Sequence, residues 1–180
     1  MKRAYIYIII FSLLLSFSIN ISHAKEEGTP KALAVGDIIT DFTLSDGIVS
    51  GKTISFDKDI KGKSKVIVII FMTTACSACK GEMEVLNKVA NTNPENLRLY
   101  AVSVDLEGDK TVPIYNDKYH YKTRYMLDPD FTIPQNFGFI YTPGLLVANS
   151  EGKILFMQGG FTIEDSNAIT NELSNALNLK

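Results

Sequence analysis

The sequence VIVIIFMTTACSACKGEMEVLNKVA, residues 66–90, frames the interpretation of the whole chain. Its first six residues are β-branched or aromatic and do not alternate with polar residues, which is typical of a strand buried on both faces of a sheet. A helix is predicted to start at the cysteines, because Met83, Leu86 and Val89 recur at helical spacing. The charged residues of this helix are predicted to lie on its other faces: Lys80, Glu82, Glu84 and Lys88.

Two cysteines, Cys76 and Cys79, stand where the predicted strand gives way to the predicted helix. Cys76 is expected near the helix N-terminus, where backbone N–H groups and the macrodipole favour negative charge and lower the pKa of a thiol. Cys79 follows one turn later, close enough to attack a mixed disulfide on Cys76. The pair is therefore predicted to alternate between dithiol and disulfide and to pass two electrons to a partner.

Other uses of the two cysteines are less well supported. A disulfide between residues three apart closes a small loop, so it removes little entropy from the unfolded chain and adds little stability to the fold. A zinc site would need two further ligands, and His120 is the only histidine beyond the first 24 residues. We therefore expect redox chemistry rather than a structural disulfide or a metal site.

The remaining apolar segments predict an α/β fold. Helical segments between strands imply a mostly parallel central sheet, and a turn at residues 149–152 predicts that the last two strands form a hairpin. Thr162 and Asp165 are placed to cap a terminal helix. Strands are expected at 42–44, 53–56, 66–71, 97–104, 124–127, 145–147 and 154–156, and helices at 76–90, within 105–123, at 132–137 and around 169–177.

The first 24 residues have the pattern of a secretory signal peptide. Lys2 and Arg3 precede a long apolar run, and small residues close the segment at Ala24, where a signal peptidase would cut. An uncleaved membrane anchor is the alternative, because the apolar run is just long enough to span a bilayer. Either outcome exports the chain to an oxidising compartment, which we expect to be the periplasm. Residues 25–36 are interpreted as a flexible lead-in and residues 37–180 as the folded domain.

The composition indicates one globular domain. Apolar residues make up 46% and charged residues 21% of the 180 residues, both close to the globular average. This length leaves no room for two sizeable domains. Lys and Arg total 18 against 20 Asp and Glu, a net charge of −2. Nucleic acid is not expected as a partner, because phosphate binding needs a basic excess.

A second motif, Tyr141-Thr142-Pro143, stands just before the strand predicted at 145–147. Together with residues 66–90 and 99–105, this motif resembles the active-site segments of thioredoxin-fold proteins. The inserted segment before Pro143 is similar to that of the TlpA/ResA branch, which comprises exported thiol–disulfide oxidoreductases related to peroxiredoxins. The resemblance implies a thioredoxin-like three-layer fold, with a central mixed sheet flanked by helices, extra strands at the N-terminus and a central insertion.

The resemblance also implies roles for individual residues. Cys76 would be the attacking thiol and Cys79 the resolving thiol. Pro143 would be a cis-proline facing the disulfide, and Thr142 would offer backbone hydrogen bonds to an extended substrate. Ala75 occupies the position where the family commonly carries Trp, which leaves a smaller and less aromatic platform beside the attacking thiol.

Two further positions depart from the family pattern. Ile70 stands where thioredoxins carry a buried acid, six residues before the first cysteine, so a base for the resolving thiol must come from elsewhere. Ser77-Ala78, between the cysteines, matches neither the usual dipeptide of strong reductants nor that of strong oxidants. The dipeptide therefore leaves the reduction potential open.

We expect an exported thiol–disulfide oxidoreductase that acts on cysteine-containing exported proteins, chiefly as a reductase, with disulfide formation as the alternative direction. Cytochrome c maturation and disulfide repair are the roles that the resemblance suggests for a reductase. A reductase would need a membrane thiol as its electron donor. No cofactor, metal or nucleic acid is expected, and the membrane would be contacted only through an uncleaved N-terminal segment.

Two other activities of this fold stay open as alternatives. A peroxiredoxin-type thiol peroxidase needs a Pro and a Thr before its reactive cysteine and a distant Arg. Thr73 fits that pattern, but Ile69 stands in place of the Pro, and Arg124 matches the distant Arg only weakly. A copper metallochaperone would use a Cys-x-x-x-Cys motif and a distant His, whereas the spacing here is one residue shorter and the histidine is His120.

Overall fold

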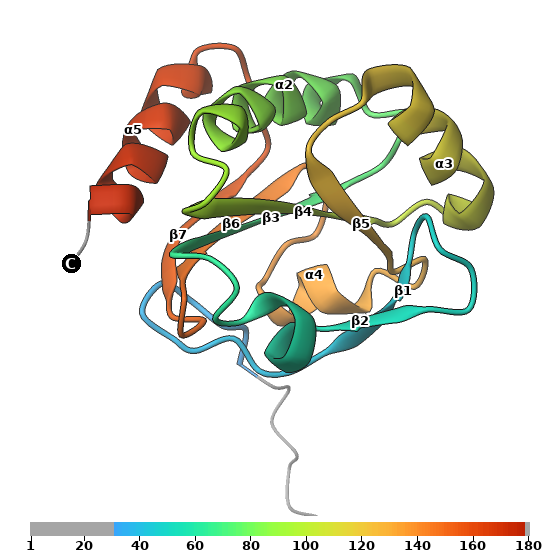
Figure 1. Ribbon diagram of the computed structural model, residues 1–180, viewed down its shortest axis with the longest axis horizontal. Helices are drawn as coiled ribbons and strands as arrows, with labels where there is room; N and C mark the ends of the chain where they lie inside the picture. Colours follow the sequence, from blue (N-terminus) through green and yellow to red (C-terminus); the bar gives the residue numbers. More distant parts are fainter. Residues whose placement is uncertain (1–30, 179–180) are drawn as a thin grey trace, which may run out of the picture. The chain divides into compact units, whose positions relative to one another are not determined.

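The computed structural model describes residues 31–178 of the chain. The expected signal segment, residues 1–24, and residues 25–30 of the expected lead-in lie outside the described residues. Figure 1 shows one sheet with helices on both of its faces, which confirms the predicted three-layer fold. One face is covered by α2 (Ser77–Thr92), α3 (Gly108–Tyr119) and α5 (Asp165–Asn178), and the other by η1 (Phe56–Ile60) and α4 (Thr132–Asn136).

The sheet has seven strands in the order β2-β1-β5-β4-β3-β6-β7. Only the pairs β3–β4 and β4–β5 are parallel, and the four other neighbouring pairs are antiparallel. The expectation of a mostly parallel sheet is therefore wrong, because the N-terminal strands as well as the late hairpin join the parallel centre in antiparallel orientation. The strands are β1 (Thr43–Asp46), β2 (Thr53–Ser55), β3 (Val66–Met72), β4 (Leu97–Ser103), β5 (Thr123–Leu127), β6 (Gly144–Asn149) and β7 (Ile154–Gly159).

The strand β3 has buried side chains on both faces of the sheet. Val66, Val68 and Ile70 belong to the apolar core under α2, α3 and α5. The alternate residues Ile67 and Ile69 belong to a second core, which includes η1 and the aromatic residues that follow α4. Because side chains alternate along a strand, a strand covered on both faces must be apolar at every position, as this one is.

The helix α2 begins and ends where the sequence indicates. Cys76 is its N-cap residue, and Asn93, just before Pro94, is its C-cap residue. At the terminal helix α5, the Asp165 carboxylate accepts hydrogen bonds from both the backbone N–H and the hydroxyl of Thr162. These contacts satisfy polar groups that would otherwise be left unpaired at a helix N-terminus.

Two local features differ from the sequence expectation. Phe56 was expected to end a strand but begins η1, whose first turn is capped by the Ser55 hydroxyl accepting from the Lys58 N–H. The second difference concerns the lead-in. Its residues Leu33 and Gly36 donate backbone hydrogen bonds to Asn136 and Ile154. Contacts with the folded domain thus begin before residue 37.

Within residues 31–178, the helices all fall short of the length and apolarity needed to cross a bilayer.

We expect replacement of Ile69 by Ala to lower the free energy of unfolding by about 2–5 kcal/mol, because it leaves a cavity in the central strand. Ile69 is fully buried. Urea unfolding would measure the loss. The matched control is Ile163→Ala, at an exposed position, which should change stability by less than about 0.5 kcal/mol. Equal effects of the two substitutions would contradict the central position of β3.

Candidate active site

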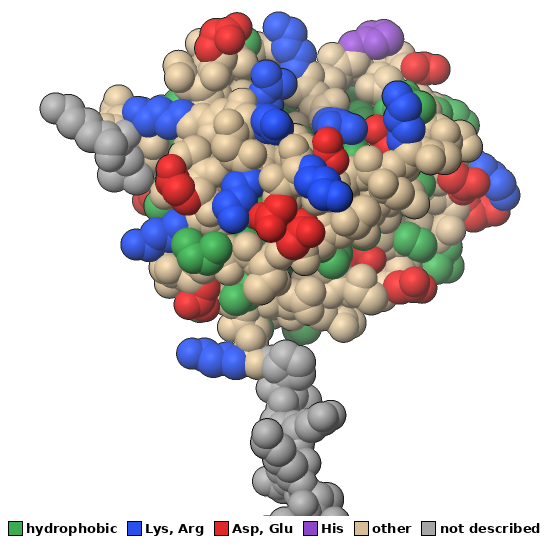
Figure 2. All heavy atoms as spheres, turned by 60° about the horizontal axis from the view of Figure 1, so that its bottom comes forward, with side chains coloured by type: hydrophobic (Ala, Val, Ile, Leu, Met, Phe, Trp, Pro, Cys, Tyr) green, Lys and Arg blue, Asp and Glu red, His purple; other side chains and the backbone are tan. Residues whose placement is uncertain are grey.

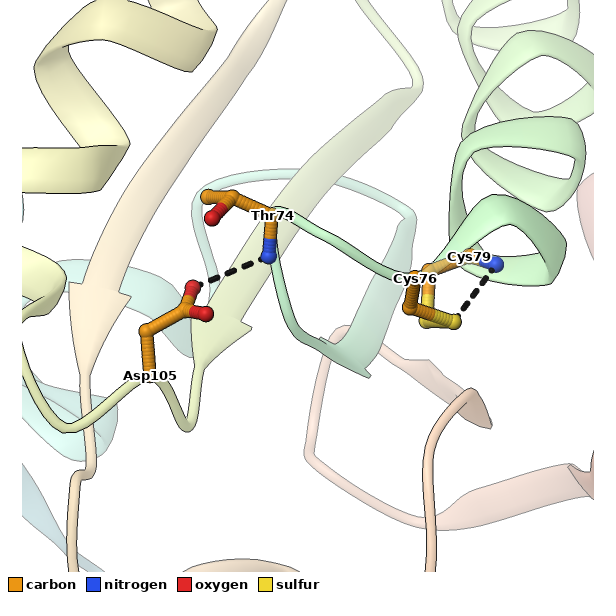
Figure 3. The surroundings of a disulfide bond; sticks show 4 residues. All are labelled: Thr74, Cys76, Cys79 and Asp105. Carbon is orange, nitrogen blue, oxygen red and sulfur yellow. Dashed lines mark hydrogen bonds between the residues drawn. A yellow bond between two sulfur atoms is a disulfide. The ribbon is translucent and has the colours of Figure 1, made fainter.

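Cys76 and Cys79 form a disulfide at the start of α2, with their Cα atoms 5.2 Å apart. β3 ends at Met72, and a short loop leads from it into the N-cap residue Cys76. Figure 3 shows this loop and the disulfide at the first turn of the helix. Cys76 is half-buried, whereas Cys79 is fully buried in the core between the sheet and α2. Only one of the two sulfur atoms is therefore open to a partner.

Backbone groups of α2 surround Cys76. The Cys79 N–H donates to Cys76 Sγ at 3.0 Å, and the Lys80 N–H donates to the Cys76 carbonyl oxygen at 3.1 Å. The N-terminus of a 16-residue helix carries partial positive charge, so this position favours a thiolate over a thiol when the disulfide is reduced.

The loop before the disulfide is held by Asp105, which follows the end of β4. One Asp105 carboxylate oxygen accepts hydrogen bonds from the Thr74 N–H at 2.9 Å and from the Ser103 hydroxyl at 2.7 Å. Figure 3 shows Asp105 reaching across to Thr74, two residues before Cys76. Since β3 and β4 are parallel neighbours, their carboxyl ends meet, and Asp105 can fasten the loop directly.

The predicted substrate-binding residues lie at the same end of the sheet. Gly144 pairs with Phe71 near the end of β3, so Thr142 and Pro143 lie beside the point where β3 gives way to the disulfide loop. The Thr142–Pro143 peptide bond is cis. Pro143 is buried, Thr142 is half-buried, and Ala75 is exposed beside Cys76. The fold thus brings together segments that are distant in sequence.

Glu82 departs from the sequence prediction. It was expected on an exterior face of α2, but it is fully buried on the core-facing stripe, together with Cys79, Met83 and Leu86. Glu82 follows Cys79 by three positions, a spacing that makes side chains neighbours on a helix. Both of its carboxylate oxygens are buried and lack a hydrogen-bond partner within the described residues.

The environment of Glu82 disfavours its charge. Burial, and to a lesser degree the negative charge of Asp165, raises the pKa of Glu82 from 4.5 to about 8. The carboxyl group therefore keeps its proton at neutral pH and would exchange it near the pH at which an ordinary cysteine thiol titrates.

Two residues considered for other activities lie away from the disulfide. Arg124 pairs with Tyr100 near the start of β5, and its guanidinium contacts Asp46 at 3.4 Å. His120 is the C-cap residue of α3, which follows β4 and runs back toward the amino ends of the parallel strands. The fold thus keeps both Arg124 and His120 at the end of the sheet opposite Cys76.

Sequence reasoning missed Glu82 and Asp105. A signal for Glu82 was present, because it falls on the apolar stripe defined by Cys79, Met83 and Leu86. For Asp105 the only signal is its place after an apolar strand parallel to the one that leads to Cys76. Its hydrogen bond to the Thr74 N–H becomes visible only in three dimensions.

Comparisons with known proteins agree with this architecture. The model of the AhpC/TSA family matches residues 35–157. No curated protein sequence matches the chain. A Chlorobium tepidum protein assigned as thiol:disulfide interchange protein DsbE superposes with a TM-score of 0.70 at 20% identity, over 81% of this chain and 99% of that one.

Two further solved structures have the same fold. A Neisseria meningitidis protein assigned as a thioredoxin gives a TM-score of 0.61 at 28% identity, over 76% of this chain and 87% of that one. A secreted Mycobacterium tuberculosis disulfide oxidoreductase, described as homologous to E. coli DsbE, gives 0.59 at 18% identity, over 74% and 95%. The chain thus has the fold of thioredoxin-like thiol–disulfide oxidoreductases and a Cys-x-x-Cys pair at disulfide distance.

The raised pKa of Glu82 predicts a pH-dependent stability. Because the folded protein holds this proton to about pH 8 whereas the unfolded chain releases it near pH 4.5, stability should fall as pH rises between these values and then level off. Glu82→Gln should remove a fall on the order of 2–5 kcal/mol. Urea unfolding between pH 4 and 9 would measure this fall in stability. Glu84→Gln, at an exposed position, is the control. Equal falls in Glu82→Gln and in the parent protein would refute the raised pKa of Glu82.

Asp105→Ala should loosen the loop before the disulfide, because it removes the acceptor of the Thr74 N–H and of the Ser103 hydroxyl. We expect a loss of about 1–3 kcal/mol in stability and faster hydrogen exchange at the Thr74 amide, followed by NMR. Asp117→Ala, at an exposed position on α3, is the control. An unchanged Thr74 exchange rate in Asp105→Ala would show that the carboxylate does not hold the loop.

Proposed function

The chain belongs to the AhpC/TSA family, and we propose that it works as an exported thiol–disulfide oxidoreductase of the TlpA/ResA type, reducing disulfides in other exported proteins. The observation that carries this proposal is the asymmetry of the cysteine pair. Cys76 is half-buried at the N-terminus of α2, and Cys79 is fully buried beneath it. A partner can therefore exchange only with Cys76 Sγ, whereas Cys79 Sγ can reach only Cys76.

The reaction would proceed through a mixed disulfide. The Cys76 thiolate attacks one sulfur of a partner disulfide, and the other partner sulfur leaves as a thiolate that takes up a proton. Cys79 then loses its proton and attacks Cys76 Sγ, which releases the second partner sulfur. The partner gains two electrons and two protons, and the Cys76–Cys79 disulfide remains.

Thioredoxins carry a buried acid where this chain has Ile70. In this proposal Glu82 takes over the acid–base role of that residue. It is a neighbour of Cys79 on α2 and is buried with it. With a pKa of about 8, Glu82 is matched to a thiol and can exchange a proton with it in the neutral range. In this proposal the ionised fraction of Glu82, which is the minority at pH 7 and grows toward pH 8, accepts the Cys79 proton as Cys79 attacks the mixed disulfide.

A partner segment would bind beside Cys76 on an apolar surface. Ile140 and Tyr141, directly before Thr142, are 82% and 55% exposed. The loop after β7 borders them, since the Gly160 N–H donates to the Pro143 carbonyl oxygen at 2.8 Å, and this loop carries Ile163, which is 73% exposed. We assign to Thr142 and Pro143 the binding of the backbone of an extended partner segment. Ala75 replaces the Trp that is common in the family, which leaves room for the partner's side chains.

The reducing direction requires a source of electrons. A membrane thiol would return the Cys76–Cys79 disulfide to the dithiol after each turnover, and partners would be exported proteins with disulfides, such as cytochrome c precursors. The charged start, apolar run and small residues of positions 1–24 support export to the periplasm.

Cys79→Ala should trap partners, because the mixed disulfide on Cys76 can no longer be resolved. We expect Cys79→Ala, expressed in the native cell, to accumulate mixed disulfides on non-reducing gels, with mass spectrometry locating the bond at Cys76. The Cys76→Ala variant is the matched control and should trap nothing. Trapping by Cys76→Ala at the same level, or its absence in Cys79→Ala, would overturn the proposed function.

A further inference from the structure

A pocket of about 570 Å³ lies at the end of the sheet opposite the disulfide. β5 begins at Thr123, opposite Leu99, so the first two residues of β4 have no neighbour on that side and leave a notch in the sheet. The disulfide follows the carboxyl end of β3, whereas the notch is at the amino ends of these parallel strands. Seven residues at about 3.3 Å each separate the two ends by about 20 Å.

Buried residues and exposed basic residues both line the pocket. Leu97, Leu99 and Tyr100 are buried, the two leucines on one face of β4 and Tyr100 on the other. Four exposed cationic residues line the same pocket together with a single acidic residue, Asp59: Lys63, Arg98, Lys122 and Arg124. In a chain with a net charge of −2, this local excess of positive charge is unusual.

The positive charges are poorly compensated. Arg124 contacts the Asp46 carboxylate at 3.4 Å, and the Arg98 Nε donates to the Lys63 carbonyl oxygen at 3.2 Å. Within residues 31–178, Lys63, Arg98 and Lys122 form no salt bridge. Because like charges on neighbouring strands repel each other, an anion in the notch would relieve this repulsion.

Tyr100 is buried near the positive charges of the pocket. Burial raises the pKa of Tyr100, and the nearby Arg98 and Arg124 charges act against this rise. Tyr100 pairs with Arg124 on the neighbouring strand β5, and Arg98 lies two positions before Tyr100, on the same face of β4. A ligand in the pocket would meet a phenol hydroxyl and two planar guanidinium groups, which bind phosphate and carboxylate oxygens in pairs.

We propose that this notch binds a small organic anion with at least two phosphate or carboxylate groups and an apolar portion. The anionic groups would contact Arg98, Lys122, Lys63 and Arg124 at the rim, and the apolar portion would cover Leu97 and Leu99. Figure 2 shows one face of the molecule, on which Lys and Arg side chains are interspersed with Asp and Glu side chains. The site is separate from the redox site and does not depend on the proposed function.

NMR titration of the protein tests this site, with inorganic pyrophosphate and citrate as probes and sodium chloride at matched ionic strength as the salt control. We expect saturable shifts at the amides of Arg98, Lys122 and Thr123, and none at Cys76. The double variant Arg98→Gln/Lys122→Gln should bind at least 10-fold more weakly. A matched control, Lys110→Gln/Lys153→Gln, removes two exposed cations outside the pocket and should bind as the parent protein does.

The two probes distinguish the anionic group, and binding of either supports the site. Absence of saturable binding by both probes, or equal affinity in the parent protein and the Arg98→Gln/Lys122→Gln variant, would overturn the proposal. Variant-sensitive binding to phosphatidylglycerol vesicles without binding of either free anion would also overturn it, in favour of a membrane contact. Disulfide reduction by the variant should stay unchanged, so this result is distinguishable from failure of the redox assignment.

Discussion

The burial of β3 on both faces is the constraint from which the rest of the structure follows. All seven of its residues are apolar and inaccessible, so it must lie inside the sheet, between β4 and β6. Its carboxyl end is then fixed, and the loop after Met72 can deliver Cys76 only to the start of α2. A rigid strand thus positions the reactive sulfur, while the loop itself remains short.

Two neighbouring strands complete the same end of the sheet. β4 ends beside β3 and carries Asp105 to the Thr74 amide, and β6 begins beside β3 and brings Pro143 to the same place. The amino ends of β3, β4 and β5 lie far from this chemistry, where the basic notch occurs. One sheet therefore separates a redox end, defined by Cys76 and Cys79, from a charged end that is free to serve another purpose.

Much of this arrangement was predictable from the sequence, and the exceptions have physical causes. Hydrophobic runs identified β3, β4 and the hairpin, and the Cys-x-x-Cys spacing identified Cys76 and Cys79, because both signals are local. The antiparallel entry of β1 beside β5 depends on pairing between distant segments, so the order of elements could not reveal it. Glu82 was predicted to be exposed because burying a carboxylate costs desolvation free energy, so a charged residue in a helix is expected on its solvent face. Phe56 was misplaced because the Ser55 cap turns the chain out of the strand.

The account depends most directly on the inequality of the two thiols, which pH-dependent alkylation measures. The reduced protein would be treated with iodoacetamide across a pH series, and mass spectrometry would assign the modified residue. The account predicts that Cys76 reacts first, with a midpoint below the value of about 8.5 of an ordinary cysteine, and that Cys79 reacts only after unfolding. Faster reaction at Cys79, or a Cys76 midpoint at or above that ordinary value, would contradict it.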